Sequence, residues 1–317
     1  MAVEFSCRFY FKKIYEAPYS EKTNWEPSAV VTDSVMGSKL LQDTVINHTY
    51  VINDSLIYKQ HYRTDAFGRR ITPSTGPDSL YTDFIMVTGC SFAFGYGLNQ
   101  YQTLSYYLDS LSGKRGYDYG VSGHGTQQTL ALLQSRNLST EIAETNGVLI
   151  YLFIDDHIAR LIGSRRLIKL WARNYPYYYL DDGELKRDGS FWTGRQLLSR
   201  FYRAISESAF IDLFDIDLPW YVSESHLALY GAVLGEAKKE FKNQYPKGEF
   251  LVVIEPNSKL GARVSAVLTE NSIDFLNLSE LLDKEESKYK IHWTEAHPNE
   301  NYYLEVANAI NSYLNNR

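Results

Sequence analysis

Hydrophobic and polar positions follow one pattern before about residue 80 and another after it. From residue 83 onward, continuous apolar runs have the composition of strands buried on both faces: residues 84–88 (FIMVT), 147–153 (GVLIYLF) and 249–254 (EFLVVI). Between or after them, apolar residues recur at helical spacing over residues 103–111, 126–135, 226–243 and 301–314. Strands that alternate with helices predict a parallel sheet covered by helices.

Weaker signals complete this outline. Residues 117–121 and 272–276 read as short strands, with a short helix near Leu278. Residues 1–80 lack helical periodicity and carry β-type stretches at 44–52 and 55–62, which predicts a β-rich N-terminal extension beside an α/β domain of residues 81–317. Residues 158–225 are too long for an ordinary loop. We expect this insertion to hold one or two helices, such as 193–206, and to overhang the site.

Composition and charge exclude several classes of protein. The 317 residues are 44% hydrophobic, enough for a sizeable core, and the net charge of −6 with no basic run argues against a nucleic-acid partner. No stretch approaches the roughly 18 apolar residues that would span a membrane. Two cysteines exclude a disulfide framework. The compartment stays open, since the chain could be cytoplasmic or an exported domain whose signal or anchor lies outside this sequence.

A serine and a histidine stand out at the two ends of the α/β region. Ser91 follows the first apolar strand in FIMVTGCSFAFGYG, and His297 lies in EAHPN just before the last helix. Ligands of parallel sheets bind at the carboxyl ends of the strands, where Ser91 is expected. The pair suggests nucleophilic acyl chemistry. Taken separately, the two fragments read as a Gly-Ser turn and a surface His-Pro turn.

Two further blocks extend the pattern: residues 118–127 (DYGVSGHGTQ), a glycine-rich turn, and residues 151–160 (YLFIDDHIAR), at the end of the strongest strand. With the serine and histidine blocks they resemble the four blocks of the SGNH (GDSL-like) hydrolase and esterase superfamily over residues 81–317. The resemblance implies a flavodoxin-like three-layer α/β/α sandwich. The G-x-S-x-G elbow of α/β-hydrolases is not met, because Ala93 occupies the second glycine position.

The resemblance assigns roles to single residues. Ser91 is the implied nucleophile, His297 the general base and Glu295 the acid that orients the imidazole. The backbone N–H of Gly123 joins that of Ser91 in the oxyanion hole, and Asp118 replaces the asparagine that precedes this glycine in the family. No cofactor or metal is implied; Asp155, Asp156 and His157 lie side by side at a strand end, without the spacing of metal ligands.

The third block departs from the family. Its Gly-x-Asn-Asp aligns with residues 153–156, so Asp155 replaces the oxyanion-binding asparagine. An ionised carboxylate only accepts hydrogen bonds and would repel an oxyanion. Three solutions are open: Asp155 is protonated by burial, His157 supplies the donor, or backbone N–H groups suffice. An enzyme that is weakened or inactive is the fourth possibility.

Other candidates have simpler interpretations. His124 lies in the glycine turn, where it either touches substrate or only shapes the turn. His292 competes with His297 as the base but lacks the following Pro-Asn. Two clusters are read as solvent-facing rather than as sites, although the first could bind an anionic group: Arg160, Arg165 and Arg166, and Asp212, Asp215 and Asp217.

The sequence therefore predicts a serine esterase that hydrolyses acyl esters, acetyl esters among them, through an acyl-enzyme on Ser91. Tyrosine-rich stretches such as residues 175–179 suit a carbohydrate or lipid-headgroup surface, although such tyrosines more often cover the edge of a core. We expect a small-molecule or glycan ester as substrate. An O-acyltransferase with the same site is the second hypothesis. A glycan- or partner-binding module that has lost the oxyanion asparagine is the third.

Overall fold

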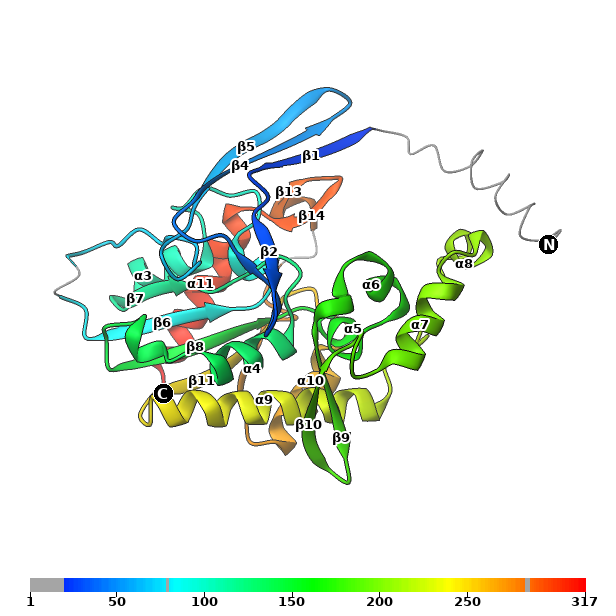
Figure 1. Cartoon of the computed structure of the whole chain (residues 1–317). Helices are drawn as coiled ribbons and strands as arrows, with labels where there is room; N and C mark the ends of the chain where they lie inside the picture. Colours follow the sequence, from blue (N-terminus) through cyan, green and yellow to red (C-terminus); the bar gives the residue numbers. More distant parts are fainter. Residues whose placement is uncertain (1–19, 78–79, 283–285) are drawn as a thin grey trace.

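The computed structural model describes residues 20–77, 80–282 and 286–317, and its centre is a five-stranded parallel sheet (Figure 1). The strands lie in the order β12–β11–β8–β6–β7. Their bounds are β6 (Asp83–Thr88), β7 (Arg115–Asp118), β8 (Asn146–Phe153), β11 (Glu249–Ile254) and β12 (Asp274–Asn277). Numbered along the chain, this is the flavodoxin order 2-1-3-4-5. The predicted fold class is confirmed.

Helices cover both faces of this sheet, because successive strand side chains point to opposite sides. Ile85 and Val87 pack with α3 (Leu104–Ser112) and α11 (Glu300–Asn315). Phe84 and Met86 face the other way, toward a second core. That core is covered by α4 (Thr126–Ser135), α9 (Glu224–Gln244) and α10 (Gly261–Glu270). None of the helices in the described part of the chain combines the length and apolar character needed to cross a bilayer.

The predicted elements agree with the structure except at the weakest signals. The strand expected at 117–121 lies earlier, at β7. The helix expected near Leu278 is absent from residues 278–282, which form turns. There the side chain of Asn277 accepts a hydrogen bond from the N–H of Ser279 at 2.9 Å, a local contact that competes with helix formation. The sequence analysis also missed α10.

The N-terminal stretch is β-rich from residue 20 onward, as predicted, and the part of this prediction that covers residues 1–19 lies outside the described residues. An antiparallel sheet of order β1–β4–β5 is formed by β1 (Glu21–Glu26), β4 (Val45–Ile52) and β5 (Ser55–Arg63). The hairpin β2 (Val30–Asp33) and β3 (Gly37–Leu40) descends beside the α/β sheet (Figure 1). Tyr62 of β5 stacks edge-on against Phe94, with ring centroids 5.0 Å apart, which ties the extension to the segment that carries Ser91.

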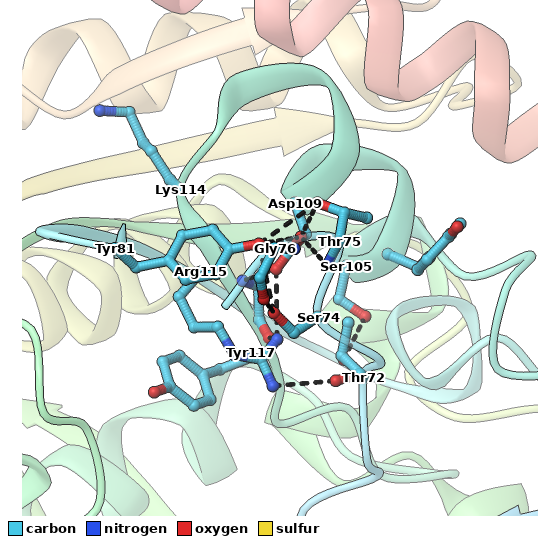
Figure 2. Close-up of polar contacts among 12 residues, drawn as sticks. Thr72, Ser74, Thr75, Gly76, Tyr81, Ser105, Asp109, Lys114, Arg115 and Tyr117 are labelled. Atoms are coloured by element: carbon cyan, nitrogen blue, oxygen red, sulfur yellow. Dashed lines mark hydrogen bonds and ion pairs between the residues drawn. The ribbon is translucent and has the colours of Figure 1, made fainter. Parts of the chain in front are cut away.

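A buried carboxylate fixes the connection between the two parts. Asp109 of α3 is fully buried and accepts hydrogen bonds from the hydroxyls of Thr75 (2.6 Å) and Tyr81 (3.0 Å) and from the N–H of Gly116 (2.9 Å) (Figure 2). Arg115 completes the cluster with an ion pair of 3.2 Å. Thr75 and Tyr81 are thereby attached to the helical layer. A domain boundary at residue 80 stays a prediction.

The insertion contains more regular structure than expected. It begins with the short helices α5 (Asp156–Ile162) and α6 (Arg165–Leu170) and continues as a hairpin of β9 (Pro176–Asp181) and β10 (Glu184–Ser190). The helix predicted at 193–206 is α7 (Gln196–Ile205), and α8 (Ala209–Leu213) follows it.

The sequence predicted that an arginine cluster and an aspartate cluster face solvent, but the two clusters form ion pairs with each other within this insertion. Arg165 lies 3.6 Å from Asp212, and Arg166 lies 3.8 Å from Asp215. Arg165 is buried, so this pairing between α6 and the segment around α8 is part of the packing of the insertion.

Candidate active site

Ser91 lies where β6 ends, at the point where the strand order reverses. The chain leaves β6 through Gly89 at φ +142°, and a Cβ there would come within 3.0 Å of the carbonyl oxygen of Leu152 on the neighbouring strand β8. Only glycine allows this close passage. Ser91 then begins the single helical turn α2 (Ser91–Phe94), which ends at Gly95 in the left-handed region. The turn places the hydroxyl at the carboxyl edge of the sheet, where ligands bind in such folds.

His297 reaches this hydroxyl from the other end of the chain. It lies on β14 (Glu295–Pro298), which pairs antiparallel with β13 (Lys290–His292) ahead of α11. Its Nδ1 is 2.6 Å from Oε1 of Glu295, and its Nε2 is 2.8 Å from Oγ of Ser91. A carboxylate only accepts, so Nδ1 carries the hydrogen and Nε2 is left to accept from the serine hydroxyl.

The carboxylate and the imidazole are both held by their surroundings. Glu295 is 9% exposed; burial by itself would raise its pKa, but hydrogen bonds from His297 and the charge of that residue hold the pKa of Glu295 below its ordinary value. The ring of Tyr96 stacks on the imidazole of His297, with centroids 4.1 Å apart and planes 18° apart. The glutamate is therefore ionised at neutral pH, and the imidazole is fixed on one face.

The N-terminal sheet backs this stack. His48 of β4 lies edge-on to Tyr96 at 4.6 Å and stacks on Trp25 at 3.7 Å. The two ring nitrogens of His48 contact the hydroxyls of Tyr62 (3.1 Å) and Thr23 (3.0 Å). Burial lowers the pKa of His48 to about 4, so it is neutral near pH 7. We call Trp25, His48, Tyr58, Tyr62 and Tyr96 the aromatic wall.

Gly123 lines the same cavity as His297. Its φ of +85° requires glycine, and a Cβ at this position would lie 2.9 Å from the hydroxyl oxygen of Tyr175. Within the residues that the structure describes, neither the N–H of Ser91 nor that of Gly123 donates a hydrogen bond. Unpaired N–H groups beside a nucleophile are what an oxyanion hole requires.

These groups line one cavity of about 580 Å³. Its floor holds Ser91, Gly123, Ile154, Asp156, Arg160 and His297. The hairpin β2–β3 and the insertion supply the walls, the insertion through Trp171, Asn174 and Tyr175. The overhang predicted for the insertion is thus shared with the N-terminal extension. Trp171 is 40% exposed and presents an aromatic surface to the cavity.

Asp155 does not lie where the sequence alignment placed it. Its carboxylate turns toward the loop after β11 and accepts hydrogen bonds from Oγ of Ser258 (2.5 Å) and the N–H groups of Lys259 (2.7 Å) and Leu260 (3.3 Å). The next residue, Asp156, lines the cavity instead. The cavity position is therefore shifted by one residue relative to the alignment: β8 ends at Phe153, and Asp156, the first residue of α5, lines the cavity in place of Asp155.

The two other histidines proposed near the oxyanion are turned away as well. His157 is fully buried and its Nδ1 is 2.6 Å from the hydroxyl of Tyr151. The side chain of His124 is buried, with Nε2 3.0 Å from the carbonyl oxygen of Ser38 on β3. Burial lowers the pKa of both, that of His124 to about 4. Neither is among the residues that line the cavity, so neither offers a donor there. His292 contacts Thr294 at 2.8 Å rather than the serine.

The sequence analysis missed Arg160 and Trp171 as cavity residues. Arg160 was read as part of a solvated helix face, yet it is 7% exposed and lines the cavity. One signal was present: Arg160 follows Asp156 by four residues, which on a helix is the same face. In the described ranges, no three or more His, Cys, Asp or Glu side chains come together in a way that could hold a metal ion. Cys90 is free and buried.

No family model matches the chain, and no curated protein matches it. The chain is similar to several solved structures, all at low sequence identity. A protein of the G-D-S-L family from Desulfitobacterium hafniense DCB-2 is 12% identical with a TM-score of 0.40, over 73% of this chain and 98% of the other. A carbohydrate esterase is 11% identical with a TM-score of 0.43, over 95% and 98%. The acetyl xylan esterase Est2A from the rumen bacterium Butyrivibrio proteoclasticus is 8% identical with a TM-score of 0.44, over 94% and 86%. At this distance the chain is similar to these proteins in outline, and its function has to be argued from its own site.

Proposed function

We propose that this protein is a serine esterase that hydrolyses acyl esters through an acyl-enzyme on Ser91. The observation that carries the proposal is the unbroken hydrogen-bonded chain from Glu295 through His297 to Ser91, with contacts of 2.6 and 2.8 Å. Such contacts lie within the range that proton transfer between a nucleophile and its base requires. A cavity of about 580 Å³ opens onto the hydroxyl, large enough for a small ester.

The reaction follows from the positions of these groups. As the oxygen of Ser91 attacks the ester carbonyl, its proton passes to Nε2 of His297, and the carbonyl π electrons move to oxygen. Glu295 holds the Nδ1–H tautomer and stabilises the imidazolium that forms. The N–H groups of Ser91 and Gly123 receive the oxyanion. The tetrahedral species collapses to the acyl-enzyme, and the alcohol leaves with the proton from His297. Water then repeats the sequence and releases the acid.

The lining of the cavity supports a carbohydrate as the alcohol of the ester. Trp171 exposes an aromatic ring at the wall, and Tyr175, Asn174 and Ser38 place hydroxyl and amide groups around it. A flat aromatic surface beside several hydrogen-bonding groups suits a sugar ring, which has apolar faces and a polar rim. A short acyl group, such as acetyl, is the simplest partner for this alcohol.

The experiment separates an enzyme from a binding module. The purified chain is incubated with p-nitrophenyl acetate and, separately, with a fluorophosphonate probe whose attachment site is mapped by peptide mass spectrometry. We expect turnover, and labelling on Ser91. Ser91→Ala should lose both, whereas Ser139→Ala, which removes an exposed serine, should keep both.

Two outcomes would contradict the proposal. If folded wild-type protein neither turns over ester nor takes the label, the cavity belongs to a binding module. If Ser91→Ala hydrolyses ester as fast as wild type, the nucleophile lies elsewhere. Acetyl transfer to added sugars, compared with release of acetate, tests the O-acyltransferase hypothesis in the same assay.

A further inference from the structure

Arg160 is a buried cation on the floor of the cavity. It lies on α5, is 7% exposed and lines the cavity together with Ser91 and Gly123. Its backbone carbonyl accepts a hydrogen bond from Nε2 of Gln127 on α4 at 2.8 Å, which fixes the root of the side chain. A charged side chain is rarely buried to this degree without a partner or a task.

The guanidinium group lies between the two loops that carry the candidate oxyanion donors. Its Nη1 donates to the carbonyl oxygen of His124 at 2.7 Å, and His124 directly follows Gly123. It also interacts with Cys90, which directly precedes Ser91. Burial by itself would lower the pKa of Arg160, but Cys90 and Asp156 hold it above its ordinary value, so the positive charge is retained.

The charge of Arg160 is only partly neutralised. Its sole ion pair within the described residues is to Asp156, at 3.6 Å, and the Asp156 side chain is 67% exposed. Nε of Arg160 is buried and has no hydrogen-bond partner in the described part of the chain. A pair that is long and half-solvated contributes little. The guanidinium therefore keeps the capacity to stabilise a further negative charge that forms beside it.

We propose that Arg160 is a catalytic residue that stabilises the oxyanion formed on attack by Ser91, in the role that an asparagine side chain would otherwise fill. This inference rests on the proposed esterase function. It answers the difficulty raised by the third block, where carboxylates occupy the expected amide position. The negative charge that develops on the carbonyl oxygen is bound by the N–H groups of Ser91 and Gly123 and faces the guanidinium. When the intermediate collapses, the electron pair on the oxyanion re-forms the carbonyl π bond, the bond to the alcohol oxygen breaks, and the alcohol leaves with the proton from His297.

The test uses Arg160→Gln with a neutral substrate, p-nitrophenyl acetate. Losing one stabiliser of the oxyanion typically lowers turnover by about 10² to 10³, so we expect kcat to fall by about that factor with KM within about threefold of wild type. Phosphonylation of Ser91 by the fluorophosphonate should slow in parallel, because charge also develops on the phosphoryl oxygen. The matched control is Arg166→Gln, which removes the same charge from a half-exposed side chain on α6 and should change neither rate.

A second variant keeps the test decisive if Arg160→Gln fails to fold. Asp156→Asn removes the exposed carboxylate beside the guanidinium, so kcat should rise, by at most about fivefold because a half-solvated ion pair weakens the cation only a little. Three results would overturn the inference: unchanged kcat in folded Arg160→Gln, a fall in kcat for Asp156→Asn, or a loss confined to KM and to anionic esters. The last would assign Arg160 to an anionic group of the substrate. Failure of the esterase proposal is distinguishable, because wild type itself would then show no turnover and no label.

Discussion

Glu295→Gln is the most informative single substitution, because it removes a charge and little else. Glutamine has nearly the shape of glutamate, and its amide oxygen can still accept from Nδ1 of His297, which the carboxylate now does at 2.6 Å. The backbone contact from the N–H of His297 to the same oxygen, at 3.2 Å, can also persist. The variant therefore tests whether the negative charge stabilises the imidazolium during attack.

The size of the effect follows from the contact. Spread over the carboxylate and the ring, the two charges are about 4 Å apart, and at an effective dielectric constant of about 20 they attract by about 4 kcal/mol. Each 1.36 kcal/mol is a factor of ten in rate, so complete loss corresponds to about 10³. Because the amide dipole of glutamine still supplies part of this stabilisation of the imidazolium, we expect kcat to fall by about 10² to 10³. We expect KM to stay within about threefold of the wild-type value.

The assay is hydrolysis of p-nitrophenyl acetate at pH 7.5, with kcat and KM measured separately and folding checked by thermal unfolding. Glu305→Gln, an exposed position on α11, is the matched control and should behave as wild type. If Glu295→Gln retained more than about a third of the wild-type kcat, the carboxylate would be a structural anchor for β14, and the charge-stabilisation argument would be refuted.

Three further predictions concern the support of the site. Tyr96→Leu removes the ring stacked on His297 and should lower kcat by about three- to tenfold, the worth of one aromatic contact, whereas a change confined to KM would refute the positioning role. Burial raises the pKa of Asp118 from 3.8 to about 7, although the charge of Arg70 opposes this. The contribution of Asp118 to the free energy of unfolding is therefore full below about pH 4 and is lost as the pH rises through 7. Between pH 5 and pH 8, the free energy of unfolding in urea should therefore fall less for Asp118→Asn than for wild type. An equal fall in the two proteins would contradict this role of Asp118. Asp109→Ala leaves the donors of Thr75 and Gly116 unpaired and should lower the free energy of unfolding by about 3 kcal/mol in the same assay, while a loss under 1 kcal/mol would show that water replaces the carboxylate.

The sheet could be predicted because its information is local. A run such as residues 249–254 is apolar at nearly every position, and its short length and β-type residues favour a strand buried on both faces. Strand β11 has those bounds. The predictions that failed concerned short elements, whose bounds are determined by side-chain contacts. The turn after Asn277 is held by hydrogen bonds from the N–H of Ser279 to the side chain of Asn277 and from the N–H of Leu281 to the carbonyl oxygen of Leu278. Strand β7 ends at Asp118, whose side chain accepts a hydrogen bond from the N–H of Gly120 at 2.9 Å.

The candidate site also has parts that the sequence predicts and parts that it does not. The sequence order placed Ser91 and His297 at the two ends of the α/β region, and topology alone brings them to one edge of the sheet. The position of Asp155 could not be read from an alignment, because a shift of one residue at the start of a helix rotates a side chain by about 100°. Arg160 was missed because the sequence does not show that α4 and the insertion bury it.

The aromatic wall has a consequence for how this chain can be recombined. The imidazole of His297 rests on Tyr96, and Tyr96 rests in turn on His48 and Trp25, two residues from the first fifty of the chain. Swapping the α/β part alone into another scaffold would leave that stack without its outer layer. A chimaera that keeps the histidine in register therefore has to carry strands β1, β4 and β5 with it.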